Sequence, residues 1–393
     1  KQDGYIAEVT MHSWMFISSY EKMRHAVINQ HGIAAMVHLG PHAFDAINGE
    51  KVQVAATVFT RAHALVKGSY VRVVNPKEEA EKDKELRTAV KDPDGGWFYR
   101  ADAESFKSIP GWVIGYWASA STLDAFKKGV QLNKIGQPRV GLQTGKNALF
   151  VREWWEVARN REWFDCPSIE ASIESGKTWF PYNKGGEYRK WYGNNECVVN
   201  WENDGFKIRH NVDSNGKLLS RPQNTAFFFK PSITWSKVSS GAIAFRYKPQ
   251  GCIFDVAGTS IFANEDTLKY LQGVLNSSII LTIAGILSPT LNFEVGQIAT
   301  YPIIIDQELE PKVNQIVDEQ RSLSRTNWDA FETSWDFQTH PLAQPGEPLI
   351  ERQFARWQAE CQARFDILKA NEEELNRIFV TIYHMEGEVD WKV

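Results

Sequence analysis

The chain lacks the short patterns by which most metal and redox sites are recognised. Its four cysteines stand singly, without the C-x-x-C spacing of a zinc or dithiol site: Cys166, Cys197, Cys252 and Cys361. Six of its nine histidines fall near the N-terminus without an H-x-H or H-E-x-x-H pattern: His12, His25, His31, His38, His42 and His63. We therefore expect no metal centre, and four reduced thiols as in a cytoplasmic protein.

Long apolar runs and targeting signals are also missing. The longest strongly apolar run, Ile279–Leu287, is too short to span a bilayer, and no secretory signal is present. There is no initiator methionine, and a strand-like run, Tyr5–Val9, begins almost at once. The sequence predicts a cytoplasmic protein without membrane contact, and we interpret it as a fragment of a longer one. Its 393 residues, 43% of them hydrophobic, suggest two or three globular domains.

Two motifs approach nucleotide-handling patterns without matching them. Gly141–Asn147 has too few residues between its glycines for a Walker loop and no Ser or Thr after its Lys, so it is either a simple turn or a backbone contact to a phosphate. Phe180–Asn183 lacks the Asn and the second Pro of Asn-Pro-Pro-Tyr, the base-clamping motif of amino-methyltransferases. No strand–G-x-G–helix pattern indicates a nucleotide cofactor. The chain therefore carries no complete cofactor motif.

The net charge of −4 is small, but the charges are unevenly distributed. Residues 177–250 contain 12 Lys and Arg against 5 Asp and Glu, a balance of +7, with 14 aromatic residues among them. Residues 308–393 contain 9 against 17, a balance of −8. Because salt screens charges beyond about 10 Å, a polyanion responds to the local field. The middle of the chain therefore favours a nucleic-acid partner. The acidic end is either a solvated helical face or a docking surface.

Residues 177–195, which we call the aromatic–basic segment, alternate cations, aromatics, glycines and amides without a helical or strand period. Lys and Arg contact phosphates, aromatic rings stack, and Asn reads base edges. The aromatic series in and after this segment permits three interpretations: a partly buried core, nucleic-acid stacking or a sugar platform. The positive local charge disfavours the third. The series comprises Trp179, Tyr182, Tyr188, Trp191, Tyr192 and Trp201.

The hydrophobic patterns predict an α/β chain of four parts. In order, these are the end of an α/β domain (1–75), a linker with a surface helix (76–110), a mixed α/β domain (111–307) and a helical extension (308–393). Within the first part we expect three strands: Tyr5–Thr10, which should be buried, Ile33–Leu39 and Val52–Phe59. Within the last part, apolar residues at helical spacing predict one long helix, Leu349–Phe379.

Sequence blocks along nearly the whole chain resemble, in the expected order, the PglX family, the adenine-specific DNA methyltransferases of BREX phage-defence systems. The blocks are Gly4–Arg24, Gly141–Gly145, Trp179–Gly186, Arg189–Asn195, Ser220–Thr225, Phe254–Gly258, Leu287–Gly296 and Lys369–Arg377. More loosely, the chain is similar to the methyltransferase–specificity fusions of type IIG restriction-modification enzymes. The resemblance implies that residues 1–75 end a Rossmann-like methyltransferase sheet and that residues 111–307 form a DNA target recognition domain.

The resemblance also implies an activity. The family transfers a methyl group from S-adenosylmethionine to adenine N6 in a DNA site, after flipping the adenine out of the duplex. The cofactor loop and the Asn-Pro-Pro-Tyr clamp precede the matching region in the family, so we expect no cofactor-binding residue in this chain and no activity from it alone. One catalytic element carries over: an aromatic residue that stacks on the flipped adenine, which Phe44 matches. The alternative for Phe44 is an ordinary core residue.

The leading hypothesis is therefore the target-recognition part of a site-specific DNA adenine N6-methyltransferase in phage defence or restriction-modification. Its partners would be double-stranded DNA and, as a further candidate, other phage-defence subunits. The alternative is a non-catalytic DNA-specificity or assembly subunit. Predicted phosphate contacts are Lys177, Lys184, Arg189 and Lys190. Tyr182 and Trp191 are predicted to pack against the DNA backbone or displaced bases. Candidate base readers are Asn194, Asn195, Arg221, Gln223 and Asn224.

Overall fold

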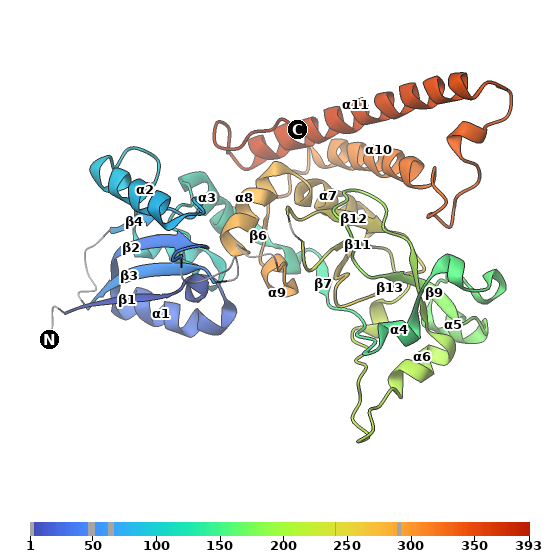
Figure 1. The fold of residues 1–393 in the computed structure, drawn as a ribbon, viewed down its shortest axis with the longest axis horizontal. Coiled ribbons are helices and arrows are strands. Elements are labelled where there is room, and N and C mark those ends of the chain that lie inside the picture. Colours follow the sequence, from blue (N-terminus) through green and yellow to red (C-terminus); the bar gives the residue numbers. More distant parts are fainter. Residues whose placement is uncertain (1–3, 46–51, 62–66, 240, 289–291) are drawn as a thin grey trace. The chain divides into compact units, whose positions relative to one another are not determined.

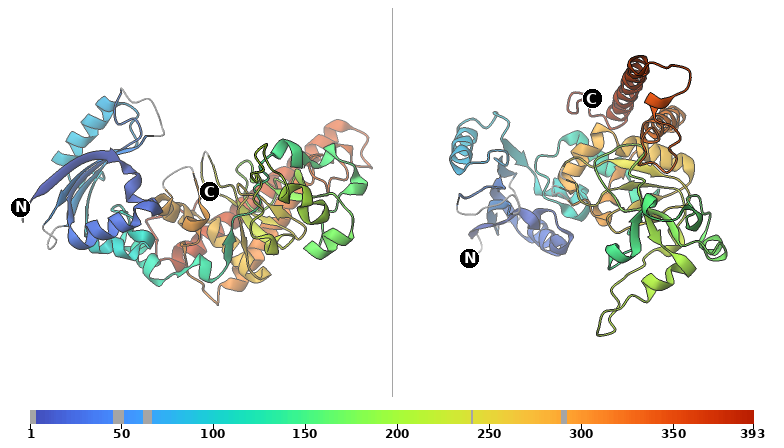
Figure 2. Two further views of the ribbon diagram at one scale, coloured as in Figure 1. Left: turned by 90° about the horizontal axis from the view of Figure 1, so that it is seen from below. Right: turned by 45° about the vertical axis from the view of Figure 1, so that its right-hand side comes forward.

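A computed structural model of the chain describes residues 4–45, 52–61, 67–239, 241–288 and 292–393. It contains two compact units. Unit 1 comprises Lys1–Lys128 with Gly285–Pro289, and unit 2 comprises Gly129–Ala284 with Thr290–Val393. Figures 1 and 2 show the elements of both units, which we describe separately. The predicted mixed α/β class with a helical C-terminal part is confirmed. The domain boundaries predicted from the sequence, at residues 75, 110 and 307, stay predictions.

Unit 1 is built on a five-stranded sheet of order β1-β3-β2-β4-β5. Strand β3 is antiparallel to both β1 and β2, so β1 and β2 run in the same direction, and β4 runs parallel to β2. The carboxyl ends of β1, β2 and β4 therefore share one edge of the sheet. The elements are β1 (Tyr5–Met11), α1 (Glu21–Gln30), β2 (Gly32–Gly40), β3 (Val54–Thr60), β4 (Gly68–Arg72), α2 (Glu79–Lys91), β5 (Phe98–Ala101) and α3 (Ala120–Lys128).

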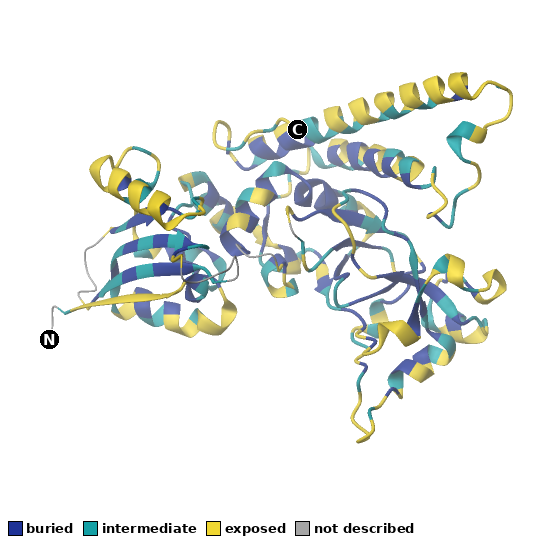
Figure 3. Cartoon of the chain, viewed as in Figure 1, coloured by how far each residue is buried: buried dark blue, intermediate teal, exposed yellow. Residues whose placement is uncertain are grey.

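The outermost strand, β1, is exposed on both faces. All seven of its residues are exposed, including the apolar Ile6 (62%) and Val9 (61%) (Figure 3). The predicted strand at this place is confirmed, but its predicted burial is wrong. The reason is that, among the described residues, β1 pairs only with β3 and neither of its faces is covered. Strands β2 and β3, which have neighbours on both sides, confirm the other two strand predictions.

A buried lysine ties helix α2 to the sheet. The Lys82 ammonium donates to the carbonyl oxygens of Leu39 (2.7 Å) and Val73 (2.9 Å), which follow the paired ends of β2 and β4. Burial lowers the pKa of Lys82 below its ordinary value. The remainder of α2 is charged and exposed, as the predicted surface helix requires.

Two of the N-terminal histidines meet in the core of unit 1. His12 Nδ1 lies 2.8 Å from His38 Nε2, and His38 Nδ1 lies 3.1 Å from the Tyr116 hydroxyl. Burial lowers the pKa of His12 to about 4 and that of His38 to about 3, so both rings are neutral near pH 7. In the part of the chain that the structure describes, which excludes His63, no three His, Cys, Asp or Glu side chains are grouped to hold a metal.

Unit 2 contains two four-stranded sheets, β13-β9-β10-β8 and β12-β11-β14-β7, and the small pair β15-β6. The strands are β6 (Val130–Gln131), β7 (Gln137–Arg139), β8 (Val151–Glu153), β9 (Trp179–Asn183), β10 (Cys197–Asn200), β11 (Ser232–Trp235), β12 (Phe245–Lys248), β13 (Ile253–Phe254), β14 (Ser260–Phe262) and β15 (Pro302–Ile303). The helices are α4 (Asn147–Phe150), α5 (Ile169–Glu174), α6 (Glu202–Arg209), α7 (Glu265–Leu275), α9 (Val295–Ile298), α10 (Glu310–Trp328) and α11 (Ile350–Ile382). The residues of α8 (Ser278–Leu287) divide between the two units.

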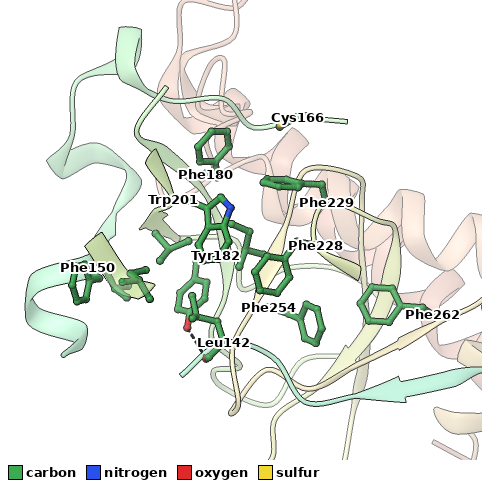
Figure 4. Close-up of a cluster of buried hydrophobic side chains, with 14 residues drawn as sticks. Leu142, Phe150, Cys166, Phe180, Tyr182, Trp201, Phe228, Phe229, Phe254 and Phe262 are labelled. Carbon is green, nitrogen blue, oxygen red and sulfur yellow. Dashed lines mark hydrogen bonds between the residues drawn. The ribbon is translucent and has the colours of Figure 1, made fainter. Parts of the chain in front are cut away.

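The core of unit 2 is aromatic (Figure 4). Phe228 makes edge contacts with Trp201 and Phe254, at ring-centroid distances of 5.0 and 5.6 Å, and Phe180 packs on Phe229 at 5.5 Å. Edge-to-face packing of this kind stabilises a core by more than the buried area alone. These rings come from β9, β13 and the loops beside them, so the sequence around the aromatic–basic segment builds much of this core.

Helices α10 and α11 lie side by side in unit 2 (Figures 1 and 2). Gln320 of α10 donates to the Leu368 carbonyl of α11, and Lys312 pairs with Glu374. From 353 to 368 the less exposed positions of α11 recur every three or four residues, as expected of a helix with one covered face: 353, 357, 361, 364 and 368. From 371 to 380 every position except 377 is at least partly buried. The prediction of a long C-terminal helix is confirmed.

No single helix among the described residues is both long enough and apolar enough to cross a bilayer. Helices α7 and α8 satisfy these criteria only when taken together, and a bend of 77° separates them.

The paired histidines predict acid sensitivity of unit 1. Because their pKa values in the folded state lie below the ordinary 6.5, the unfolded chain takes up protons first as the pH falls. The unfolding free energy of unit 1 therefore has its full value above about pH 6.5 and falls towards pH 4. At about pH 5 the loss is about 2 kcal/mol for each histidine. Hydrogen exchange of the β2 amides measures this loss. The variant His12→Gln/His38→Gln should show a flatter pH dependence than His210→Gln, which alters an exposed ring. Equal slopes would contradict the prediction.

Candidate nucleic-acid interface

The aromatic–basic segment begins as a strand and continues as an irregular loop. Its residues Trp179–Asn183 form β9, although the sequence showed no strand period. Tyr182 in this strand is buried, and its hydroxyl donates to the Asp255 carboxylate, whose other oxygen accepts the Ala257 N–H at 2.6 Å. Burial raises the pKa of Tyr182 and of Asp255. Tyr182 is therefore a core anchor that joins β9 to Asp255, the residue directly after β13.

Two buried cations hold the loop that follows. The Lys248 ammonium donates to the carbonyl oxygens of Gly193 (3.0 Å) and Asn194 (2.8 Å) and to the side-chain oxygen of Asn195. The Arg246 guanidinium donates to the Arg189 carbonyl at 3.3 Å. Both cations lie on β12 and are 1% exposed. Burial lowers the pKa of Lys248 to about 7. Two buried side chains, Arg246 and Lys248, thus hold the loop in place through hydrogen bonds to its carbonyl groups.

The structure favours the first interpretation of the aromatic series, a partly buried core. Four of its members are buried: Tyr182, Trp191, Tyr192 and Trp201. Trp179 is half-buried, and Tyr188 is 58% exposed. The Trp191 indole donates to Glu372 Oε1 of α11 at 2.7 Å. Of the series, only Tyr188 offers an open ring face.

The 12 Lys and Arg side chains of residues 177–250 have different partners and different degrees of exposure. Four pair with carboxylates: Lys190 with Glu372, Lys207 with Glu202, Arg209 with Asp204 and Lys237 with Glu294. Arg246 and Lys248 are buried, and Lys177 donates to the Asn160 carbonyl. Arg189 stacks on Trp328. Exposed cations without a carboxylate within 4.0 Å among the described residues are Lys184, Lys217, Arg221 and Lys230.

Two motifs about 80 residues apart form one surface of unit 2. Gln143 and Arg221 pair as an isolated antiparallel bridge, with N–H···O distances of 3.0 and 2.7 Å. The Asn224 side chain donates to Val140 O at 2.9 Å, and Gln223 Nε2 donates to Gly141 O at 3.3 Å. We call this surface the recognition face. Its exposed side chains include Gln143, Lys146, Arg221 and Asn224, beside the partly exposed Arg139 and Gln223.

A hairpin projects from the recognition face. Its arms pair at Val212 and Leu218, and Asp213 Oδ1 accepts the N–H groups of Asn215 and Lys217 to close the turn. In Figure 1 this segment is the long loop that extends away from α6. Leu218 on one arm of the hairpin is 60% exposed.

Hydrogen bonds join the base of the hairpin to the Gly141–Asn147 motif. Asn211 Nδ2 donates to Ser220 Oγ at 2.8 Å, and the Ser220 hydroxyl donates to the Thr144 carbonyl at 2.5 Å. Gly145 has φ +72°, and a Cβ there would meet the Leu219 carbonyl oxygen at 2.5 Å. Glycine is therefore required at position 145 so that the hairpin can approach the Gly141–Lys146 loop.

The structure thus separates the predicted DNA-contacting residues into two groups. The first group is exposed or partly exposed, with part of each side chain open to solvent: Lys177, Lys184, Arg189, Lys190, Asn194, Arg221, Gln223 and Asn224. The second is buried and engaged inside unit 2: Tyr182, Trp191 and Asn195. Arg221, Gln223 and Asn224 lie together on the recognition face, whereas Arg189, Lys190 and Trp191 face α10 and α11. The predicted residues therefore do not form one continuous surface.

Sequence reasoning missed part of the recognition face. The two interpretations of Gly141–Asn147, a simple turn and a backbone contact to a phosphate, assign no role to the Lys146 side chain, and the sequence patterns assign none to Arg139 or Lys217. The signal for Lys217 was available, because Asp213-Ser-Asn-Gly216 between Val212 and Leu218 is a typical turn sequence between two apolar arms. Arg139 carried no such signal, since its guanidinium is positioned by the Phe227 ring, 5.1 Å away at the centroid.

Phe44 lies in unit 1, after the carboxyl end of β2. It is 37% exposed, and the next residue, Asp45, donates its N–H to Glu79 Oε2 of α2 at 3.1 Å. Gly40 and His42 have positive φ (67° and 53°), so the chain turns sharply before Phe44. The ring therefore stands near the edge of the sheet at which β1, β2 and β4 end.

Comparison with known proteins decides the relationship. No protein-family model matches the chain. Over 400 residues it is 39% identical to the adenine-specific methyltransferase PglX of Lacticaseibacillus casei (strain Zhang), which covers 99% of the chain and 33% of PglX. The chain is a relative of the PglX adenine-specific methyltransferases. It is also 35% identical over 348 residues to the adenine-specific methyltransferase BrxX of Escherichia coli O9:H4 (strain HS), covering 87% of the chain and 27% of BrxX.

The resemblance to PglX predicted from the sequence blocks is confirmed. The chain spans about a third of the length of the PglX relatives it matches. Among solved structures, the type IIL restriction-modification enzyme MmeI in complex with DNA is similar with a TM-score of 0.49 and 10% identity, over 98% of the chain and 48% of MmeI.

The buried position of Tyr182 gives a prediction that separates a core role from a DNA contact. Tyr182→Phe removes the hydroxyl that donates to Asp255 and leaves a buried carboxylate with one fewer partner. We expect a loss of about 1–3 kcal/mol in unfolding free energy, measured by denaturant titration. DNA affinity of the folded variant should not change. Tyr188→Phe is the matched control, because that ring is exposed, and it should unfold like the parent. If Tyr182→Phe is as stable as the parent and binds DNA less tightly, the assignment to the core is wrong.

Proposed function

We propose that this chain supplies DNA target recognition to an adenine N6-methyltransferase. The observation that carries the proposal is the recognition face, where Arg221 and Asn224 meet the Gly141–Lys146 loop. Arg binds the guanine edge and Asn the adenine edge in the commonest bidentate base contacts, while Lys neutralises phosphates. The relatives, which carry the name adenine-specific methyltransferase, support the same activity for the protein to which this chain belongs.

The projecting hairpin extends the proposal to groove geometry. A two-stranded β-ribbon fits the major groove of B-DNA. The hairpin 211–220 is a short form of such a ribbon with one bridged residue pair, its tip closed by Asp213 and its base fixed to Thr144. Lys217 and Leu218 on its arms would meet phosphates and thymine methyl groups. This assignment places base reading on the face and the hairpin, and leaves the buried part of the aromatic–basic segment as their support.

Unit 1 fits the end of a methyltransferase sheet in this proposal. Ligands of open α/β sheets bind beyond the carboxyl ends of the parallel strands, and Phe44 is partly exposed there. The exposed β1, with Ile6 and Val9 on opposite faces, would pair with a further strand of the catalytic domain. S-adenosylmethionine would supply the methyl group. The described residues contain no glycine-rich strand-to-helix turn that would hold it, so we assign it no contact in this chain.

Removing one base reader tests the proposal. Methylome sequencing of cells with and without the gene identifies the DNA site, and fluorescence anisotropy then measures affinity for a duplex carrying it. Arg221→Gln and Asn224→Ala should each cost about 1–3 kcal/mol for the correct site and relax the preference at one base pair. Lys217→Gln should weaken binding to all duplexes and reduce the salt slope by about 1.

The matched control for this test is Arg356→Gln, an exposed and ion-paired arginine of α11. It should bind the duplex like the parent chain. The proposal fails if Arg221→Gln and Asn224→Ala retain parental affinity and specificity while their melting temperatures are unchanged.

A second test concerns the proposed stacking of Phe44 on the target adenine. In the gene product that carries this chain, Phe44→Ala should slow methylation by an amount equivalent to about 1–3 kcal/mol, since one base–aromatic stack is lost. Duplex affinity should change less than the rate. Phe331→Ala, which truncates a similarly exposed ring (42%), is the control. Undiminished methylation by Phe44→Ala would show that the ring is an ordinary structural residue.

A further inference from the structure

A groove in unit 2 lies between the exposed end of the aromatic–basic segment and the C-terminal helix pair. It encloses about 630 Å³, within the size range of small-molecule sites. One wall is Tyr188–Trp191, and the other is formed by the inner face of α11 from Cys361 to Glu372, with Ser324 and Asn327 of α10 between them. The recognition face contributes no residue to it.

The side chains that line the groove carry more positive than negative charge. Its lining includes four cations: Arg189, Lys190, Arg364 and Lys369. The single carboxylate side chain among the described lining residues, Glu372, is fully engaged. Its Oε2 pairs with Lys190 at 2.8 Å, and its Oε1 accepts the Trp191 indole N–H at 2.7 Å. The other three cations therefore depend on partners outside the lining or have none.

Neither arginine forms an ion pair with a described carboxylate. Burial lowers the pKa of Arg189, and Glu196, acting from further away, partly offsets that lowering. Among the described residues, no carboxylate lies within 4.0 Å of either guanidinium, and Val393 at the rim forms no ion pair with them. Arg189 rests on the Trp328 ring, 4.9 Å from its centroid, and Arg364 donates only to Cys361 Sγ at 3.3 Å. Lys369 reaches Glu373 only at 3.9 Å. A partly buried cation without an anion is costly, which favours an external anion in the groove.

The groove is shaped around Arg189. Gly193 has φ +127°, and a Cβ at this position would lie 2.4 Å from Arg189 Cδ. The loop that contains Gly193 is itself held by the buried Lys248. Arg364 occupies one of the less exposed positions of α11, between Cys361 and Leu368, where an apolar residue would normally face α10. Both arginines are therefore positioned by the fold rather than placed on a free surface.

Two exposed rings border the cations. Tyr188 is 58% exposed and Phe365 is 59% exposed, and both line the groove. Aromatic faces stack on nucleobases without regard to sequence, and guanidinium groups bind phosphates through paired N–H donors. A nucleotide unit combines the two chemistries that this groove offers.

We propose that the groove between Tyr188–Trp191 and α11 binds the phosphoryl group of a nucleotide unit, with Arg189 and Arg364 on the phosphate and Tyr188 or Phe365 on the base. The phosphate belongs either to a free nucleotide or to a strand of DNA outside the recognition face. This binding does not depend on the proposed target recognition, because the two surfaces share no residue.

Titration of the 393-residue chain with two probes tests this assignment. The probes are adenosine diphosphate and a short single-stranded oligodeoxynucleotide, each measured by calorimetry. We expect at least one of them to bind, and Arg189→Gln/Arg364→Gln to weaken it about tenfold or more. Binding of the diphosphate identifies a free nucleotide as the source, and binding of the oligonucleotide alone identifies the DNA backbone. Adenosine, which has no phosphate, should bind far more weakly than the diphosphate.

Two controls keep the result interpretable. Arg352→Gln changes an exposed arginine of the same helix and should bind both probes like the parent. Phe365→Ala removes an exposed ring without altering the arginines and should weaken binding less than the double variant does. The proposal is overturned if neither probe binds, if the folded double variant binds like the parent, or if adenosine binds as tightly as the diphosphate.

Discussion

Two cations buried against the aromatic–basic segment, Lys248 and Arg246, fix the irregular loop of unit 2 that forms one wall of the groove beside α11. Residues 189–195 form no regular element, and Trp191, Gly193 and Asn194 have positive φ. Their carbonyl groups therefore lack the partners that a helix or sheet provides. Lys248 and Arg246 donate to three of them. An irregular loop is stable inside a protein only when its polar groups are satisfied in this way.

Because some of the cations are buried in this way, a local excess of Lys and Arg in the sequence does not equal the positive charge on the surface. The balance of +7 over residues 177–250 is divided among ion pairs, buried anchors and exposed cations. The buried anchors contribute to folding, and the paired cations contribute little to the field that a polyanion meets. Of the exposed cations that remain, Arg221 lies on the recognition face and Lys217 on its hairpin, while Lys184 and Lys230 lie elsewhere and Arg189 lines the groove beside α11. Local charge thus predicts a region of the chain for nucleic-acid contacts, but it does not indicate which side chains face outward.

Patterns of hydrophobic residues predicted β2, β3 and α11 at nearly their observed bounds, because these elements carry their periodicity within one continuous segment. The exposure of β1 was not predictable in the same way. Its apolar composition matches an interior strand, but the described chain provides only β3 beside it. Tyr182 shows the same limit. Nothing in Phe180–Asn183 signals that Asp255, 73 residues later, accepts its hydroxyl hydrogen.

The sequence by itself determined the kinship with adenine-specific methyltransferases, the α/β class, the long C-terminal helix and the stretch of chain in which nucleic-acid contacts are expected. These follow from order, composition and period, which are properties of the linear chain. The tertiary structure alone decided that the Gly141–Lys146 loop meets Arg221–Asn224, that half of the aromatic–basic segment is core, and that Arg189 and Arg364 share one groove. The physical reason is that burial and pairing depend on which distant residues meet, and no local pattern specifies those partners.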